Sequence, residues 1–249
     1  MHNNVTVIIL AGGIGSRLGT IGQIVPKPLM PIYDSILIEG NLLYATTHFE
    51  NVIVSTRPEL LGMFKSYLKT IQTKNEWANR VKLISNSSHQ KSSLDALSFL
   101  KSVINTEYFL LMFSDIYFLS DPFVNMPNKV ENNILGLTKI VKKSNKKLGL
   151  AKTQNEKVIS LKYDFLDEDL NNSEWNGISI MKSNYLQLLD TFLIEQSTPI
   201  PEEDFINNLI FNDIIFKYIL TPQFINANTN EDLFTISQIR RNTLLNLNQ

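Results

Sequence analysis

The first residues of the chain that could do chemistry follow a short apolar run near the N-terminus. Residues 10–32 read LAGGIGSRLGTIGQIVPKPLMPI, with three glycines, then Arg17, and then Lys27 between two prolines. A glycine turn after a strand lets backbone N–H groups approach phosphate oxygens. Arg17 offers a planar fork of donors, and Lys27 offers a compact charge restrained by its neighbours. Two cations beside a glycine turn suit phosphoryl or nucleotidyl transfer, because that chemistry depends mostly on positioning and charge neutralisation.

Two common phosphate-binding motifs do not fit this segment. A Walker loop ends in Gly-Lys-Ser/Thr, whereas this chain has Gly15-Ser16-Arg17. The dinucleotide pattern Gly-x-Gly-x-x-Gly needs a glycine where Leu18 stands, and Gly19 comes one residue late. The segment therefore predicts a nucleotide site of another type.

The elements that must position these residues follow from the hydrophobic pattern. Apolar, β-branched runs of strand length occur at residues 5–10, 51–56, 81–85, 108–113 and 134–140. Apolar residues recur with helical spacing at 59–71, 93–104, 203–219 and 231–247. Strands that alternate with helices predict an α/β fold with a largely parallel central sheet. We expect one domain over 1–249, with a nucleotide-binding part over about 1–140 and an acceptor-binding part over about 141–249.

Composition excludes several classes of function. The 249 residues include 23 Lys and Arg against 24 Asp and Glu, and a nucleic-acid-binding face would need a basic surplus. The absence of cysteine excludes disulfides, thiolate zinc sites and a cysteine nucleophile. No apolar run approaches the roughly 20 residues of a membrane span, and the N-terminus is typical of a core strand rather than a signal peptide. We therefore expect a cytoplasmic protein with neither a nucleic-acid nor a membrane partner.

Taken together, the glycine turn, Arg17 and the Pro-Lys-Pro-Leu segment resemble the signature of the sugar-phosphate nucleotidyltransferases, also called NDP-sugar pyrophosphorylases. These enzymes include thymidylyltransferases, guanylyltransferases and cytidylyltransferases. Residues 31–34 (PIYD) and 55–56 (ST) are similar to the thymidylyltransferase members in particular, which favours a pyrimidine nucleotide. The resemblance is dense over 5–57 and intermittent afterwards. It implies a Rossmann-like, three-layer α/β/α fold with a mostly parallel mixed sheet.

The resemblance also implies roles for individual residues. Arg17 would hold the leaving pyrophosphate, and Lys27 would contact the phosphates around the reacting α-phosphorus. Asp115, which follows the apolar run 108–113, stands where the family has a magnesium-binding Asp, so Mg²⁺ is the expected cofactor. The residues expected to bind the nucleotide are Leu10, Ala11, Gly12, Gly13, Gly15, Ser92 and Ser93. The residues expected to bind the acceptor are Lys162, Asn176 and Gly177.

Three positions depart from the family pattern. Asn226 stands where the second magnesium-binding Asp belongs; its amide oxygen ligates Mg²⁺ without adding charge, so we expect weaker metal binding. Most members have Glu-Lys-Pro near the sugar, whereas residues 161–164 read LKYD, and Lys162 would do part of that work. Ser92 and Ser93 replace smaller residues of the base loop, and they either contact the base or only cap a helix.

Five lysines between residues 139 and 147 have two interpretations. A run of charge is usually a solvated loop. The alternative is a basic lip that attracts a phosphorylated substrate.

The sequence thus predicts an enzyme that condenses an NTP with a sugar 1-phosphate by direct in-line attack, giving an NDP-sugar and pyrophosphate. A phosphorylated alcohol or amine, as used by the choline-phosphate branch, is the alternative acceptor. A catalytically silent, nucleotide-binding regulator is the alternative from another class; Asn226 favours it, and the Arg17 and Lys27 pair disfavours it. The base, the acceptor and the oligomeric state, including a homo-oligomer, stay open.

Overall fold

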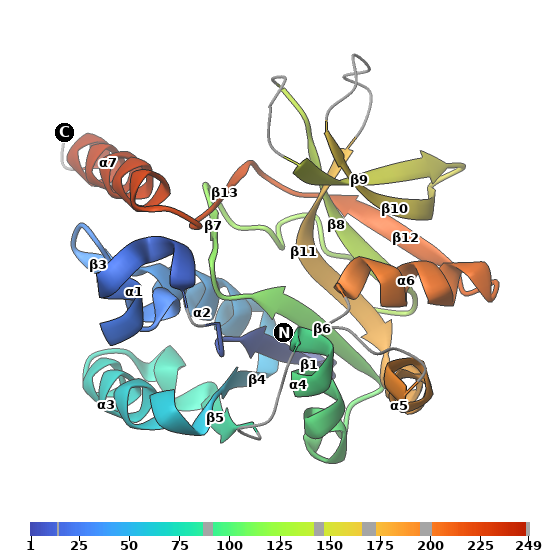
Figure 1. Ribbon diagram of the computed structural model, residues 1–249, viewed down its shortest axis with the longest axis horizontal. Helices are drawn as coiled ribbons and strands as arrows, with labels where there is room; N and C mark the ends of the chain where they lie inside the picture. Colours follow the sequence, from blue (N-terminus) through green and yellow to red (C-terminus); the bar gives the residue numbers. More distant parts are fainter. Residues whose placement is uncertain (14, 87–91, 142–146, 166–172, 195–200, 248–249) are drawn as a thin grey trace.

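In the described part of the chain, a nine-stranded sheet is covered by helices on both faces in this computed structural model (Figure 1). The structure describes residues 1–13, 15–86, 92–141, 147–165, 173–194 and 201–247. The strands lie in the order β5-β4-β1-β6-β11-β8-β12-β10-β9. Their bounds are β1 His2–Leu10, β4 Phe49–Thr56, β5 Val81–Ser85, β6 Tyr108–Phe113, β8 Asn133–Lys139, β9 Lys147–Gln154, β10 Lys157–Phe165, β11 Ser173–Lys182 and β12 Phe216–Leu220.

Strands β5, β4, β1 and β6 form a parallel half of the sheet. Strand β1 lies inside it and is buried on both faces: Val7 and Ile9 pack into one core, and Ile8 and Leu10 into the other. This double burial explains why the sequence there is continuously apolar instead of alternating. The other half is mostly antiparallel, although β12 runs parallel to β8. The sheet is therefore mixed.

Helices form the two outer layers (Figure 1). Helices α2 (Leu37–His48) and α3 (Leu61–Gln72) cover one face through residues such as Leu42 and Phe64. Helices α4 (Ser93–Leu100), α5 (Leu186–Ile194) and α6 (Glu202–Phe211) cover the other through residues such as Leu97, Leu189 and Phe205. The molecule is a three-layer α/β/α structure, as the family resemblance implied.

Apart from α7, the elements not yet named are short. The remaining helices are α1 Gly19–Ile24 and α7 Asn230–Leu247, and the short strands are β2 Pro31–Ile32, β3 Ser35–Ile36, β7 Ile116–Phe118 and β13 Phe224–Asn226. The 3-10 helices are η1 Ser16–Leu18, η2 Lys27–Leu29, η3 Pro58–Leu60, η4 Glu76–Arg80, η5 Lys101–Val103 and η6 Ser183–Tyr185. Helix α7 packs Ile236 against Ile32 and Leu37, and Arg240 pairs with Asp34 at 2.5 Å. Among the described residues, no helix combines the length and apolarity that crossing a bilayer requires.

One predicted helix is wrong in its second half. The pattern predicts a helix over 203–219, but α6 ends at Phe211 and Asp213 adopts a left-handed φ of 61°. The following FKYIL segment forms β12 and pairs with β8. Aromatic and β-branched residues favour a strand where a partner strand is available, and local helical spacing does not reveal that partner.

The other predicted strands and helices are confirmed. The strands expected at 5–10, 51–56, 81–85, 108–113 and 134–140 correspond to β1, β4, β5, β6 and β8. The helices expected at 59–71, 93–104 and 231–247 correspond to α3, α4 and α7. Residues 142–146, which hold three of the five clustered lysines, lie outside the described residues.

A single glycine fixes how β11 passes the end of β6, and its replacement tests this packing. Gly177 has a φ of 79°, and a Cβ there would collide with the Phe113 ring and stand 2.8 Å from Ile116 Cδ1. We predict that Gly177→Ala lowers the free energy of unfolding by at least about 2 kcal/mol in urea titrations, through backbone strain and overpacking. Gly40→Ala in α2 is the control: its Cβ would meet nothing nearer than 4.0 Å. The control should be neutral or stabilising by up to about 1 kcal/mol. Equal effects of the two substitutions would contradict the prediction.

Candidate active site

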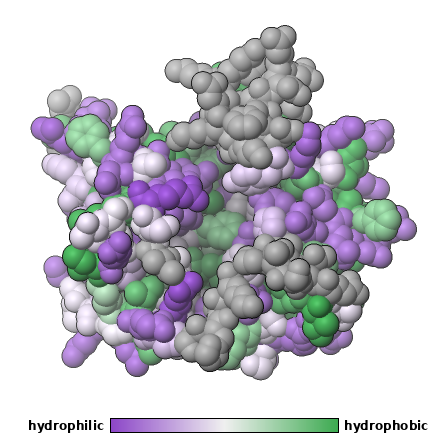
Figure 2. All heavy atoms as spheres, viewed as in Figure 1, coloured by the Kyte–Doolittle hydropathy of each residue, from purple (hydrophilic) through white to green (hydrophobic). Residues whose placement is uncertain are grey.

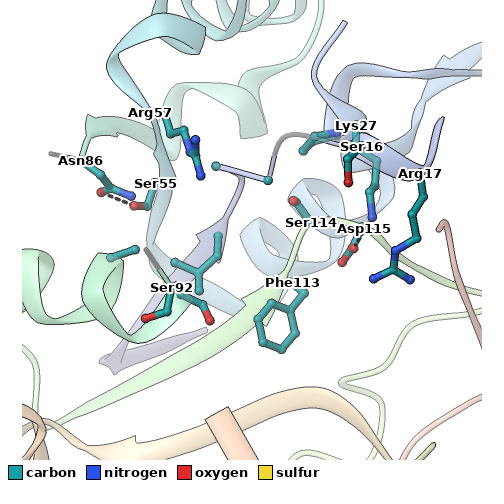
Figure 3. Close-up of a pocket in the computed structure, with 17 residues that line it drawn as sticks. Ser16, Arg17, Lys27, Ser55, Arg57, Asn86, Ser92, Phe113, Ser114 and Asp115 are labelled. Carbon is teal, nitrogen blue, oxygen red and sulfur yellow. Dashed lines mark hydrogen bonds and ion pairs between the residues drawn. The ribbon is translucent and has the colours of Figure 1, made fainter. Parts of the chain in front are cut away.

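A cavity of about 370 Å³ opens where the parallel strands end (Figure 3). Leu10, the last residue of β1, pairs with Ser55 of β4 on one side and with Phe113 of β6 on the other. Residues that follow these strands therefore meet at one edge of the sheet, where open α/β sheets bind ligands. The space-filling view of the molecule is hollowed near its centre, with hydrophilic residues on either side (Figure 2). Among the predicted site residues, those that line the cavity are Leu10, Gly12, Gly13, Gly15, Arg17, Lys27, Ser92, Ser93 and Asp115.

The glycine turn after β1 is anchored on the neighbouring strand. Ala11 is fully buried; its N–H donates to the Ser55 carbonyl at 2.7 Å, and its carbonyl accepts from the Thr56 hydroxyl at 3.2 Å. Gly15 precedes η1 with a left-handed φ of 67°, which favours glycine. The hydrogen bonds of Ala11 thus fix the turn to strand β4, while the glycines line the cavity.

An ion pair joins the glycine-rich segment to the end of β6. Lys27 Nζ lies 2.8 Å from Asp115 Oδ2, and the same ammonium donates to Asn228 Oδ1 at 3.1 Å. The Lys27 side chain is only 13% exposed, whereas that of Asp115 is 33% exposed. The second oxygen of Asp115 accepts no hydrogen bond from the described part of the chain. Sequence reasoning assigned no role to Asn228, because a neutral amide in a loop carries no spacing signal.

A buried amide on α2 holds the turn that carries Asp115. Asn41 is 2% exposed, and its Nδ2 donates to the carbonyls of Phe113 at 3.2 Å and Ile116 at 2.9 Å. These two carbonyls flank Asp115 in the chain, so one side chain fixes both ends of the turn. Asn41 is a second residue that sequence reasoning missed, since nothing in a helix sequence marks a polar residue as a support for a distant loop.

The segment that contains Asn226 lies beside this turn. Strand β13 pairs with β7, with Asn226 opposite Ile116, and the Ala227 N–H donates to the Asp115 carbonyl at 2.8 Å. The Asn226 side chain is exposed. Among the described residues, no three His, Cys, Asp or Glu side chains converge as metal ligands. The structure brings Asn226 to the neighbourhood of Asp115, and its role as a ligand stays a prediction.

Arg17 lies on the same side of the cavity as Lys27 and Asp115 (Figure 3). It is exposed on η1, in contrast to the enclosed Lys27. Burial and nearby carboxylates raise the pKa of Tyr163 on β10, and the positive charge of Arg17 opposes this rise.

The opposite side of the cavity is lined by three polar residues, Ser55, Arg57 and Asn86, to which sequence reasoning assigned no role in the site. Ser55 is fully buried, and its hydroxyl donates to Asn86 Oδ1 at 2.5 Å. Arg57 lies over the glycine turn: a Cβ on Gly12 would stand 3.4 Å from Arg57 Cγ (Figure 3). Each of these residues ends or follows a parallel strand, so the rule that sites form at strand ends would have identified them.

Ser92 caps helix α4, which is one of the two interpretations that the sequence allowed, and it also lines the cavity. Its hydroxyl accepts from the Asp95 N–H at 3.2 Å, and its own N–H donates to the Asp95 carboxylate at 2.8 Å. This reciprocal pair is a capping box at the start of α4. Ser93 begins the helix and lines the same cavity. The cap orients α4 toward the ligand space, and contact of either serine with a base stays a prediction.

The three predicted acceptor residues lie outside this cavity. Asn176 is 1% exposed; its Nδ2 donates to the Thr221 hydroxyl at 2.5 Å, and its Oδ1 accepts from the Ile178 N–H. Gly177 allows β11 to pass close to the end of β6. Lys162 is exposed on β10, where successive side chains alternate between faces, so it points away from the face that carries Tyr163. Direct contact of these residues with an acceptor stays a prediction.

Comparison with known proteins identifies one family. The model of the nucleotidyl transferase family matches residues 6–162. A search of curated proteins gave no match.

Several solved structures share the fold. The inositol-1-phosphate CTP transferase from T. maritima has a TM-score of 0.77 at 13% identity, covering 96% of each chain. A UDP-glucose pyrophosphorylase complexed with UDP-glucose has a TM-score of 0.77 at 15% identity, covering 98% of this chain and 100% of its own. CTP:phosphocholine cytidylyltransferase from Streptococcus pneumoniae has a TM-score of 0.73 at 15% identity, covering 95% of this chain and 99% of its own. The likeness extends over nearly the whole chain and concerns the fold.

The support that Asn41 gives to the Asp115 turn can be measured as stability. We predict that Asn41→Ala lowers the free energy of unfolding by about 1–3 kcal/mol, because two carbonyls lose their shared donor in a buried place. Asn3→Ala, at an exposed position of β1, is the matched control and should stay within about 0.5 kcal/mol of the parent. Urea titration monitored by circular dichroism measures both. A difference below the error of the titration would show that the turn does not depend on Asn41.

Proposed function

Because the chain belongs to the nucleotidyl transferase family, we propose that it condenses an NTP with a phosphorylated small molecule, a sugar 1-phosphate in the first instance, to give an NDP-linked product and pyrophosphate. The observation that carries this proposal is the Lys27–Asp115 pair beside the glycine turn, at the carboxyl ends of β1 and β6. In the proposal, residues up to about 140 bind the nucleotide and the later residues bind the acceptor.

The residues of the cavity suit an in-line displacement without a covalent intermediate. A phosphate oxygen of the acceptor attacks the α-phosphorus of the NTP, the bond to the β-phosphate oxygen breaks, and pyrophosphate leaves with its electron pair. Lys27, held between Asp115 and Asn228, keeps a fixed charge near the reacting phosphate. Arg17, exposed at the rim, receives the leaving pyrophosphate. The charge of Lys27 is in place before the reaction, which is the condition under which such groups are most effective.

The donor set fits Mg²⁺. This ion binds through one or two carboxylates together with substrate phosphates and water. Asp115 is one third exposed and has an oxygen that accepts no hydrogen bond within the described chain, and the Asn226 segment lies next to it. Asp115 and Asn226 would hold the ion, which would supply charge neutralisation for the phosphates.

The far side of the cavity suits a base. Ser55, Asn86 and Arg57 gather hydrogen-bonding groups there, away from Lys27 and Asp115 (Figure 3). We place the base in this part and keep the pyrimidine preference. The three similar structures are named for CTP or UDP, which supports a pyrimidine nucleotide.

A non-sugar acceptor is the second candidate. Two of the similar structures are named for transfer to inositol-1-phosphate and to phosphocholine, and this chain has no Glu-Lys-Pro segment at 161–164. A catalytically silent, nucleotide-binding regulator would share the cavity but not the turnover. Pyrophosphate release, measured for four NTPs with Mg²⁺ against sugar 1-phosphates and phosphorylated alcohols, separates the three. Pyrophosphate release with a sugar 1-phosphate supports the first candidate. Release with phosphorylated alcohols but not with sugar 1-phosphates supports the second. Nucleotide binding without pyrophosphate release supports the regulator.

Replacement of the two cations tests the mechanism. We predict that Lys27→Ala and Arg17→Ala each lower kcat by a factor of about 10²–10³, as expected for the loss of one preorganised charge-stabilising donor. Lys69→Ala on α3 and Arg241→Ala on α7, both at exposed positions, are the matched controls and should keep parental rates. Thermal melting checks that the variants fold. A folded Lys27→Ala or Arg17→Ala enzyme with a parental rate would refute the assigned roles.

Restoring a carboxylate at position 226 tests the metal site. We predict that Asn226→Asp lowers the Mg²⁺ concentration at half-maximal rate, because a second anionic oxygen strengthens the hold on a hard cation. The variant should also bind Mn²⁺ more tightly when the ion is titrated with nucleotide and followed by electron paramagnetic resonance. Asp115→Asn should act in the opposite direction in both measurements. Superimposable parental and Asn226→Asp curves would make Asn226 a structural residue of β13.

A further inference from the structure

The residue that shares the Lys27 ammonium with Asp115 is held by the start of helix α7. Asn228 Oδ1 accepts from Lys27 Nζ at 3.1 Å. The backbone N–H of Asn228 donates at 3.0 Å to the carboxylate of Asp232, which belongs to the first turn of α7. The carboxylate of a helical residue is therefore linked through Asn228 to the ammonium that we assign to the reacting phosphate.

The same carboxylate caps the helix. Asp232 Oδ2 accepts from the Thr229 N–H at 2.8 Å and from the Thr229 hydroxyl at 2.9 Å, and the Thr229 hydroxyl accepts from the Asp232 N–H at 3.2 Å. This reciprocal pair satisfies donors at the helix start that have no partner within the helix. Because one carboxylate oxygen serves both the cap and the Asn228 N–H, the orientation of Asn228 depends on α7 being formed and capped.

The body of α7 is fixed to the short hairpin that follows the lysine in the chain (Figure 1). Ile236 is fully buried and packs in one cluster with Ile32 and Leu37. One turn further along the helix, Arg240 Nε donates to Asp34 at 2.5 Å. The helix thus holds the lysine segment through an apolar contact and an ion pair, in addition to the hydrogen bond at its start.

The contact between Asn228 and Lys27 is not needed for the cap. Thr229 and Asp232 complete the cap by themselves, and the Asn228 side chain points to a lysine that lines the cavity. An ammonium has three N–H donors in a tetrahedral arrangement. Asp115 and Asn228 direct two of the three, so the direction of the third is set as well. With either acceptor removed, the ammonium could turn about the other.

We propose that α7 is a positioning element of the transfer reaction, and that Asp232 acts through Asn228 to direct the Lys27 ammonium at the reacting phosphate. The proposal rests on the role of Lys27 proposed above. Asn228 and Asp232 are positioning residues, because they act on the phosphate only through the lysine. A misdirected charge fails as charge develops in the transition state, so its effect falls on kcat more than on KM.

Variants at the start of α7 test the split between kcat and KM. Asn228→Leu, of similar volume but without an acceptor, should lower kcat by about 10–10² and leave KM for the NTP within about twofold. Asn228→Asp keeps an acceptor oxygen and should retain a higher kcat than Asn228→Leu. Asp232→Ala should act like Asn228→Leu, and Asp232→Asn should retain more of the rate. Glu231→Ala, exposed in the same turn, is the matched control and should keep the parental rate. A parental kcat for Asn228→Leu would overturn the proposal.

A double-mutant cycle shows whether Asn228 acts through the lysine. In the Lys27→Ala background, Asn228→Leu should change kcat by less than about twofold, because residues that share one interaction are not additive. An Asn228 that only stabilised the fold would lower the rate equally in both backgrounds. Equal losses in the two backgrounds would therefore overturn the proposal while leaving the role of Lys27 intact.

Chemical labelling reads the lysine directly and needs no turnover. With limiting acetic anhydride and peptide mass spectrometry, Lys27 in the parent should react more slowly than the exposed Lys69. Asn228→Leu should raise the ratio of Lys27 to Lys69 labelling by about two- to tenfold, as expected for the loss of one hydrogen bond. Glu231→Ala should not change the ratio. An unchanged ratio in Asn228→Leu would overturn the proposal.

The labelling experiment also separates this inference from the proposed function. An enzyme that releases no pyrophosphate with any substrate would refute nucleotidyl transfer, and the labelling ratio would still decide whether α7 fixes the lysine. Thermal melting checks that each variant folds. Asn228→Leu leaves the Thr229 and Asp232 cap intact, so it tests the inference even if Asp232→Ala prevents folding.

Discussion

The ion pair between Lys27 and Asp115 is the interaction on which the site depends. It joins two segments 88 residues apart in the chain, the glycine-rich segment after β1 and the turn after β6. Asn228 adds a third segment, because its side chain accepts from the same ammonium. A lysine with two fixed acceptors cannot swing freely toward solvent, so its charge is set in position before a ligand arrives. Preorganised charge of this kind is what stabilises a transition state most effectively.

This ion pair is possible because of the sheet beneath it. Strands β1 and β6 are adjacent and parallel, and Leu10 lies level with Phe113, so the segments that follow them leave the sheet at the same height. Asn41 then fixes the turn around Asp115 from the helical layer, and the Ala227 N–H fixes it from the side of β13. The apolar sequence of β1 thus has a functional consequence: burial on both faces forces the strand into the centre of the sheet, where its end becomes the floor of the cavity.

The sequence predicts those parts of the structure whose signals are local. The apolar strand before the glycines, the glycine turn and the lysine between prolines are all visible in residues 5–28, and so is the α/β alternation. Asn41 and Asn228 could not be predicted, because each acts through a partner far away in the chain and an amide has no periodic signal. The false helix over 212–219 has the same origin, since pairing of β12 with β8 overrides local spacing. Whether the predicted contacts with nucleotide, acceptor and metal form depends on molecules that the sequence does not contain.

The two halves of the chain differ in how their charges are compensated. In the first half, Lys27 and Asp115 neutralise each other and the fold keeps them in place without a ligand. In the second half, burial raises the pKa of Glu174, Glu202 and Glu203, and no ion pair of the described chain offsets it. Unpartnered groups of this kind lower stability, and they persist where function requires them. A triphosphate brings the same charge whatever its base, so a self-compensated pair serves every nucleotide.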